Sequence, residues 1–152
     1  MGRKNQIGTT SPHDSAHSDD AVIIYTDGGA KPNPGKGGYG VVLRWRHKRK
    51  ELSGGYQRTT NNRMEITAAI RGLEALKRPM DVVLYTDSRY LANAMTKGWA
   101  KHWRRNGWMR TKQDRALNAD LWAQLLELCE KHTVTFLWVR GHGTSADNNR
   151  CD

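Results

Sequence analysis

Two acidic residues in this sequence follow apolar runs and could meet to bind a metal ion. Asp27 follows the apolar run 22–26, and Asp87 follows a second apolar run, 82–86. Both runs are rich in β-branched residues and lead into Thr-Asp, which predicts two buried strands that each end in a carboxylate. Open α/β sheets build their functional sites at this edge. Clustered carboxylates repel each other unless a hard divalent cation neutralises them, so the pattern indicates a magnesium-type site.

Two further acids and one histidine extend this pattern. Glu65 falls in the first turn of a predicted helix, and Asp152 ends a Gly- and Asn-rich segment that also carries His142. An imidazole titrates near neutrality, which suits proton transfer from a loop flanked by glycine. Four carboxylates and one histidine together predict a metal-dependent phosphoryl-transfer site.

Four of these five residues also have an ordinary interpretation, and Asp152 taken alone indicates nothing. Asp27 precedes two glycines, which is a hairpin turn signal. Glu65 has capping-box spacing from Asn62 and could serve only the helix end. Asp87 suits a plain strand end, and His142 suits a solvated loop. The joint pattern, rather than any single residue, favours the catalytic interpretation.

Composition indicates one domain that binds a polyanion. The chain has 152 residues and a net charge of +10. Residues 1–20 hold two basic and three acidic residues, so the positive excess belongs to residues 21–152. Such a field favours nucleic acid over a membrane, and the sequence shows neither a membrane span nor a secretory signal. Cys129 and Cys151 form no zinc pattern, which indicates free thiols in a cytoplasmic protein.

Basic residues gather in two segments. The stretch 97–112 interleaves Lys and Arg with Trp99, Trp103 and Trp108. We expect the indoles mainly to support a protruding segment by packing, and the cations to meet phosphates. A second cluster over residues 44–50 lies at a predicted hairpin tip, where a solvated face is the first interpretation and an auxiliary contact the second.

The pattern of apolar and turn-forming residues predicts a mixed sheet with helices on its faces. Residues 1–20 are polar and predict a disordered extension, with the folded domain over 21–152. A hairpin in the first half and strands that precede helices in the second half imply both antiparallel and parallel pairs. The expected strands cover 21–27, 39–45, 51–58, 81–86 and 133–139. The expected helices run from Asn62 to about Arg78 and over 89–96 behind a Ser88 cap, and a third, capped near Asn118, is marked by Leu117, Leu121, Leu125 and Leu128.

Several longer motifs resemble bacterial ribonuclease HI, in order and from about residue 21 to the last residue. The motifs are Tyr-Thr-Asp-Gly-Gly (25–29) with Asn-Pro-Gly (33–35), Thr-Thr-Asn-Asn-Arg-Met-Glu (59–65), Thr-Asp-Ser (86–88), and Gly-His (141–142) through Asn-Arg-Cys-Asp (149–152). The resemblance implies an α/β fold with a mixed five-stranded sheet flanked by helices. Relatives usually continue past the last acid into a helix, and this sequence ends on that acid, so the expected fold lacks the C-terminal helix. The resemblance also implies endonucleolytic cleavage of the RNA strand in RNA–DNA hybrids, leaving 5′-phosphate and 3′-hydroxyl ends.

The resemblance assigns roles to individual residues. It implies that two Mg²⁺ or Mn²⁺ ions bind with substrate to Asp27, Glu65, Asp87 and Asp152, and that His142 assists proton transfer or product release. Arg89 stands where glutamine is common, which leaves a minor-groove contact there open. The other implied substrate contacts are the minor-groove residues Asn33, Asn61 and Asn62, the DNA-phosphate residue Thr60, and the protrusion residues Trp99, Trp103, Arg104, Arg105 and Trp108.

Two rival functions remain open from the sequence. The chain could be a non-catalytic hybrid-binding module, disabled by an unsupported terminal acid at Asp152. It could also be a ribonuclease H-like domain cut from a longer polypeptide. Acids at all four positions argue against the first rival. The expectation is a monomeric, cytoplasmic nuclease whose partner is the hybrid.

Overall fold

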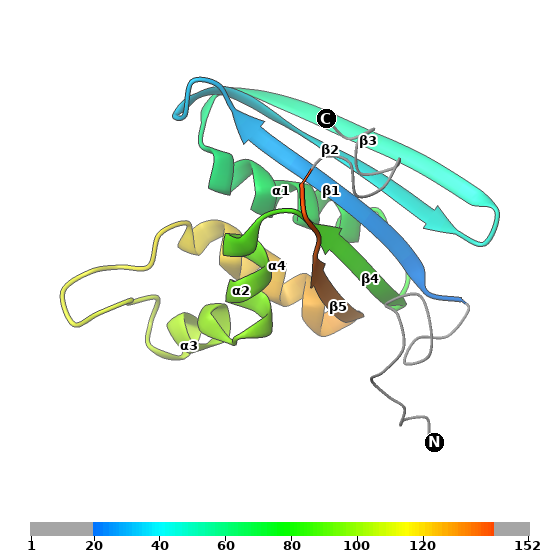
Figure 1. Ribbon diagram of the computed structural model, residues 1–152. Helices are drawn as coiled ribbons and strands as arrows, with labels where there is room; N and C mark the ends of the chain where they lie inside the picture. The colour runs from blue at the N-terminus through cyan, green and yellow to red at the C-terminus, as the bar shows by residue number, and fades with distance from the viewer. Residues whose placement is uncertain (1–19, 142–152) are drawn as a thin grey trace.

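The computed structural model describes residues 20–141 of the chain. One five-stranded sheet, in the order β3-β2-β1-β4-β5, runs through the described part (Figure 1). β1, β2 and β3 pair antiparallel, whereas β1, β4 and β5 pair parallel. The sheet is therefore mixed, as the sequence predicts. Its strands are β1 (Val22–Ala30), β2 (Gly35–Trp45), β3 (Lys48–Thr59), β4 (Asp81–Thr86) and β5 (Thr133–Trp138).

Four helices accompany the sheet within residues 20–141 (Figure 1). The larger of two buried apolar clusters joins residues of these helices to one face of the sheet. α1 packs on β1 and β2, and α4 packs on α1. Trp122 of α4 is fully buried among the apolar side chains of this core, including Ile24 and Ile66. The helices are α1 (Asn61–Glu74), α2 (Arg89–Thr96), α3 (Trp99–Arg105) and α4 (Ala119–Lys131).

Most of the predicted elements are confirmed. β4 and α2 have the expected bounds, and the Ser88 side chain accepts a hydrogen bond from the Leu91 backbone N–H as the predicted cap of α2. α4 begins directly after Asn118, as expected. Leu117, expected on the apolar face of this helix, is instead exposed and lies before α4, because the helix begins only after Asn118.

The structure differs from the prediction in four details. Thr60 caps α1 in place of the Asn62–Glu65 capping box, because its hydroxyl accepts from the Arg63 N–H at 3.1 Å. α1 also ends at Glu74, before the expected end near Arg78. β1 continues through Gly28 and Gly29, where the sequence suggested a turn, since both residues pair with β2. α3 was not predicted at all.

Several expectations fall outside the described residues: the extension over 1–19, His142, Cys151 and Asp152. Asp20, the last residue of the expected extension, is described, and its carboxylate pairs with Arg46 at 2.8 Å. Within residues 20–141, no helix is long and apolar enough to cross a membrane.

Candidate active site

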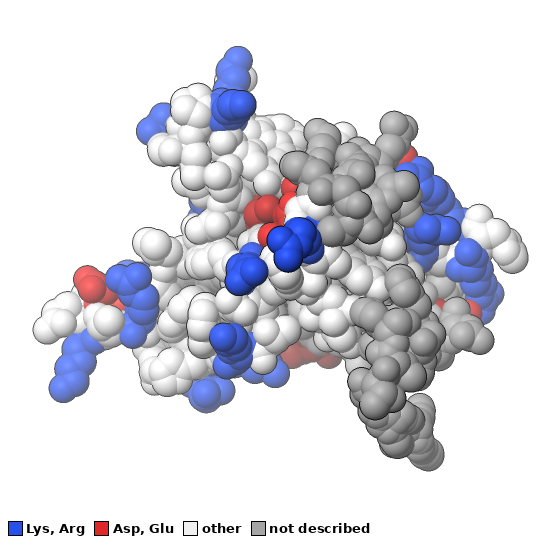
Figure 2. All heavy atoms as spheres, in the orientation of Figure 1, with Lys and Arg blue, Asp and Glu red and all other residues white. Residues whose placement is uncertain are grey.

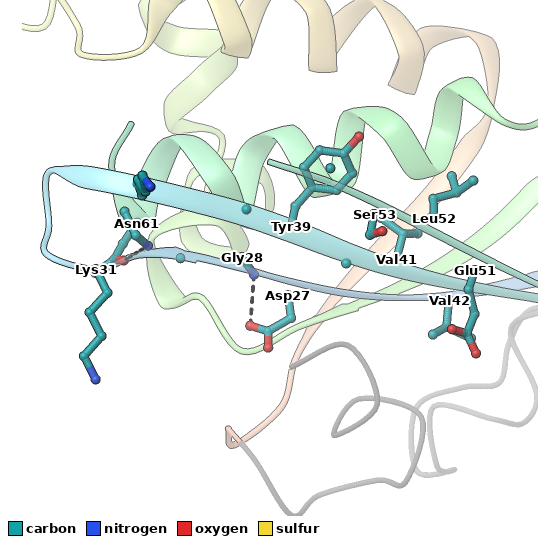
Figure 3. Close-up of a pocket in the computed structure, with 16 residues that line it drawn as sticks. Asp27, Gly28, Lys31, Tyr39, Val41, Val42, Glu51, Leu52, Ser53 and Asn61 are labelled. Atoms are coloured by element: carbon teal, nitrogen blue, oxygen red, sulfur yellow. Dashed lines mark hydrogen bonds between the residues drawn. The ribbon is translucent and has the colours of Figure 1, made fainter. Parts of the chain in front are cut away.

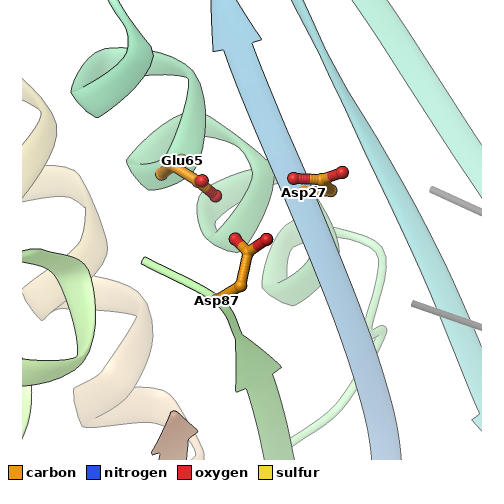
Figure 4. A group of neighbouring side chains, drawn as sticks. All are labelled: Asp27, Glu65 and Asp87. Atoms are coloured by element: carbon orange, nitrogen blue, oxygen red, sulfur yellow. The ribbon is translucent and has the colours of Figure 1, made fainter. Parts of the chain in front are cut away.

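Three predicted acids meet at one edge of the sheet. One carboxylate oxygen from each of Asp27, Glu65 and Asp87 lies within 4.8 Å of the other two (Figure 4). The three side chains come from β1, from α1 and from the end of β4, and they point toward one another. Residues far apart in the sequence therefore form one acidic cluster, the carboxylate triad.

Strand register places Asp27 and Asp87 side by side. β1 and β4 are parallel, and Tyr25 pairs with Tyr85, so the residue two positions further along each strand is an acid. The buried Thr26 hydroxyl donates to the Tyr85 carbonyl at 3.1 Å, which holds the two strand ends together. The Asp27 carboxylate accepts from the Gly28 N–H at 2.9 Å.

Helix α1 brings Glu65 to the same edge. The Thr60 cap fixes the start of the helix. Arg63 then anchors this first turn to the start of α4, because its guanidinium donates to Asn118 at 3.2 Å and to both carboxylate oxygens of Asp120. These contacts leave Glu65 on the buried side of α1, facing the strand ends.

Burial moves the pKa of Glu65 away from the ordinary value of a glutamate. Only 9% of Glu65 is exposed, and its Oε1 has no hydrogen-bond partner among the described residues. Desolvation, together with the nearby Asp87 carboxylate, raises the pKa of Glu65 to about 9. A buried carboxylate oxygen without a donor, next to two other carboxylates, fits a hard divalent cation as its missing partner.

Two of the three asparagines expected to contact the hybrid, Asn33 and Asn61, are hydrogen-bonded to each other, and Asn61 is also bonded to β1. The Asn61 side-chain oxygen accepts from the Ala30 N–H at 2.6 Å, and the Asn61 N–H donates to the Asn33 side-chain oxygen at 3.1 Å. Both amide oxygens are thus used internally. Among described residues, neither amide nitrogen has a partner, so both remain available as donors to a ligand.

A hollow of about 860 Å³ adjoins Asp27 and extends over β1, β2 and β3 (Figure 3). Much of its lining is glycine, which leaves the backbone accessible to a large ligand. Figure 2 shows acidic atoms gathered near the centre of one face, with Lys and Arg atoms directly beside them. The lining includes Gly28, Gly29, Gly38, Gly40 and Gly54, with Lys31, Lys36 and Asn61.

The predicted basic protrusion is α3 and the segment that follows it, which projects from the body of the molecule (Figure 1). Trp103 and Trp108 pack against the core, which confirms the expected packing role of these indoles, whereas Trp99 is 40% exposed. Arg104 pairs with Glu130 of α4 at 2.9 Å. Arg105 is exposed and forms no ion pair with another described residue. Arg105 is therefore more available than Arg104 to bind a phosphate.

Sequence reasoning missed one contact of the triad. The Trp138 indole N–H donates to the Asp87 backbone carbonyl at 3.1 Å. The available signal was an aromatic residue at the end of the fifth strand, four positions before His142.

Comparisons with known proteins agree along most of the chain. The RNase H family model matches residues 19–152. The ribonuclease H of Syntrophus aciditrophicus is 63% identical over 131 residues, which cover 86% of this chain and 76% of that protein. The ribonuclease HI of Synechocystis is 54% identical over 138 residues, covering 90% and 86% of the two chains.

Solved structures share the fold. LC9-RNase H1, described as a type 1 RNase H with the type 2 active-site motif, superposes with a TM-score of 0.76 at 29% identity, over 87% of this chain and 68% of that one. LC11-RNase H1 in complex with an RNA/DNA hybrid gives a TM-score of 0.65 at 28% identity, over 86% and 91% of the two chains. The family model, the sequence identity and the shared fold lead to one conclusion: this chain belongs to the ribonuclease H family.

Proposed function

We propose that this protein is an endoribonuclease that hydrolyses the RNA strand of RNA–DNA hybrids, leaving 5′-phosphate and 3′-hydroxyl ends. The observation that carries the proposal is the convergence of Asp27, Glu65 and Asp87 within 4.8 Å. Membership of the ribonuclease H family and the named activity of its relatives support it. The hybrid bound to LC11-RNase H1 supports the same class of substrate.

The proposed cofactor is Mg²⁺, with Mn²⁺ as an alternative, as two ions when substrate is bound. Asp27, Glu65 and Asp87 would hold them, with Asp152 as the fourth ligand. The ions would supply a water of lowered pKa and would neutralise charge on the attacked phosphate and the leaving oxygen. The Glu65 Oε1 is buried without a hydrogen-bond partner in the described part of the chain, and it supports this assignment because a bound cation would give that oxygen the partner it lacks.

The chain's own residues would hold the hybrid and move the proton. The amide nitrogens of Asn33 and Asn61, which have no partner among residues 20–141, suit acceptors in the minor groove, including a 2′-hydroxyl on the RNA strand. Asn62 and Thr60 would contact the same duplex, Thr60 at a DNA phosphate. His142 would accept or donate a proton near the leaving oxygen or assist product release.

The basic protrusion would bind the hybrid backbone. The Lys97 Nζ lies 5.8 Å from the centroid of the exposed Trp99 ring, which places a positive charge beside this indole. Arg105, without an ion pair in the described part of the chain, is the stronger candidate for a phosphate contact than the paired Arg104. We further propose that the protein is a monomer and acts in the cytoplasm. The second point fits the Cys129 thiol, which forms no disulfide with another residue of the range 20–141.

End-labelled nucleic acid duplexes test the proposal. The purified chain is mixed with an RNA–DNA hybrid, an RNA duplex and a DNA duplex of one sequence, with magnesium or with a chelator. Cleavage only of the RNA strand, only in the hybrid and only with magnesium is the expected result. A hybrid that shifts in a gel but stays intact would identify a non-catalytic hybrid-binding module.

A further inference from the structure

The end of strand β5 places a tryptophan beside the carboxylate triad. Trp138 is the last residue of β5 and pairs with Thr86, the residue before Asp87. Its side chain is 38% exposed, so it is not a core residue. The indole N–H instead donates to the Asp87 carbonyl at 3.1 Å. Trp138 therefore holds the peptide that carries one of the triad carboxylates.

The face of the same indole holds a cation. The guanidinium carbon of Arg89 lies 4.3 Å from the centroid of the Trp138 ring. Arg89 is exposed and forms no ion pair with any described residue. A cation–π contact with a ring does not use up the N–H donors of a guanidinium. The N–H groups of Arg89 can therefore still bind a phosphate.

Helix stability does not explain a cation at this position. Arg89 is the first residue of α2, and the first turn of α2 contains no acidic residue. The positive end of a helix dipole disfavours a cation, and Ser88 already caps this helix. An anion from outside the protein would give Arg89 the partner that the described part of the fold does not provide.

We propose that Trp138 is a positioning residue with two separable effects. The indole N–H fixes the backbone of Asp87 through its hydrogen bond to the carbonyl. The indole ring orients the Arg89 guanidinium so that it can bind a phosphate of the hybrid. This inference rests on the proposed function of the carboxylate triad. It predicts that removing the N–H lowers kcat through Asp87, whereas removing the aromatic face raises KM through Arg89.

Steady-state hydrolysis of a fluorescent hybrid by the full chain separates the two effects. Trp138→Phe keeps an aromatic face and loses the N–H, so kcat should fall about threefold to tenfold with KM near the wild-type value. Arg89→Ala should raise KM about threefold to tenfold with little change in kcat. It should also lower the log–log salt slope of binding by about 0.7–0.9, as expected for one lost phosphate contact.

Trp138→Leu should show both effects, because leucine offers neither an N–H nor a ring face. In the Trp138→Leu background, Arg89→Ala should then change KM less than it does in the wild type. An equal change of KM in both backgrounds would show that Arg89 does not depend on the indole.

Trp45, the last residue of β2, offers a matched control, because it lies beside the start of β1 and away from the triad. Its indole N–H donates to the Asp20 carbonyl at 2.9 Å, and the Arg46 guanidinium carbon lies 4.3 Å from its ring centroid. Trp45→Phe therefore loses the same kind of contact away from the triad. It should keep wild-type kcat and KM, even if its melting temperature falls as far as that of Trp138→Phe.

The outcomes are distinct. A wild-type kcat in folded Trp138→Phe, an equal loss of kcat in Trp45→Phe, or a wild-type KM and salt slope in Arg89→Ala would overturn the inference. Trp138→Tyr, which also lacks the N–H, replaces Trp138→Phe if that variant does not fold. A wild-type chain that leaves the hybrid intact would overturn the proposed function itself, whereas a cleaving wild type with unaffected Trp138 variants overturns the inference alone.

Discussion

Gly28 of β1 and Met64 of α1 lie in direct contact through their backbones. A Cβ atom added at Gly28 would lie 2.6 Å from the carbonyl carbon of Met64, which is far inside van der Waals contact. Strand and helix can approach this closely only because residue 28 has no side chain. The neighbours of these two residues are Asp27 and Glu65, so the contact sets the distance between two members of the carboxylate triad.

Gly28→Ala should therefore separate α1 from β1. We expect a loss of about 1–3 kcal/mol in the free energy of unfolding, the usual effect of overpacking, together with weaker metal binding. Urea unfolding and a manganese titration measure the two effects. Gly29→Ala is the control, since its Cβ would lie 3.4 Å from the Asn61 side-chain oxygen, an ordinary contact. Equal losses in the two variants would contradict the role of the Gly28–Met64 contact.

The raised pKa of Glu65 makes metal-free stability depend on pH. Burial and the Asp87 charge raise this pKa from 4.5 to about 9. Between these values the folded protein retains a proton that the unfolded chain releases, so stability falls as pH rises through this window. Below pH 4.5 the Glu65 carboxyl is protonated in both the folded and the unfolded state, so it does not lower the free energy of unfolding.

Glu65→Gln should remove this dependence. In the presence of a chelator, the variant should gain stability relative to the wild type as the pH is raised from 5 to 8.5. Urea midpoints at several pH values check the prediction. If the urea midpoints of the two proteins changed with pH in the same way, Glu65 would not carry a buried proton.

Arg104 and Arg105 should differ in their effect on hybrid binding. Arg105→Ala should lower the log–log salt slope by about 0.7–0.9, because it removes one phosphate contact. Arg104→Ala should change the slope less, since Arg104 is already paired with Glu130. Binding titrations of a catalytically inactive background at several salt concentrations give both slopes. A larger change for Arg104 than for Arg105 would reverse the assignment.

The sequence predicts the sheet and the two strand-borne acids well because the apolar runs before Asp27 and Asp87 are strong signals. Two parallel strands that both lead into Thr-Asp bring their carboxylates to the same edge. The start of α1 was harder to locate, because Thr60 and Asn62 are both good capping residues and only the fold selects between them. β1 continues through two glycines because pairing with β2 overrides the local turn preference.

Other features depend on contacts that no local pattern encodes. α3 is short and basic, and its residues lack a clear apolar periodicity, so the packing of Trp103 near Trp122 was needed to reveal it. The pairing of Arg104 with Glu130 joins residues from separate helices. The contact between Trp138 and Asp87 spans two strands and likewise follows from tertiary structure.

Cleavage and binding of one hybrid by Asp27→Asn test the central claim most directly. Removing this acid takes away a charge that acts mainly in the transition state, while the contacts to phosphates and the minor groove remain. With magnesium, the wild type should cut the end-labelled RNA strand, and Asp27→Asn should leave it intact while binding the hybrid with an affinity close to that of the wild type. Near-normal turnover by folded Asp27→Asn would contradict the assignment of the carboxylate triad as the active site.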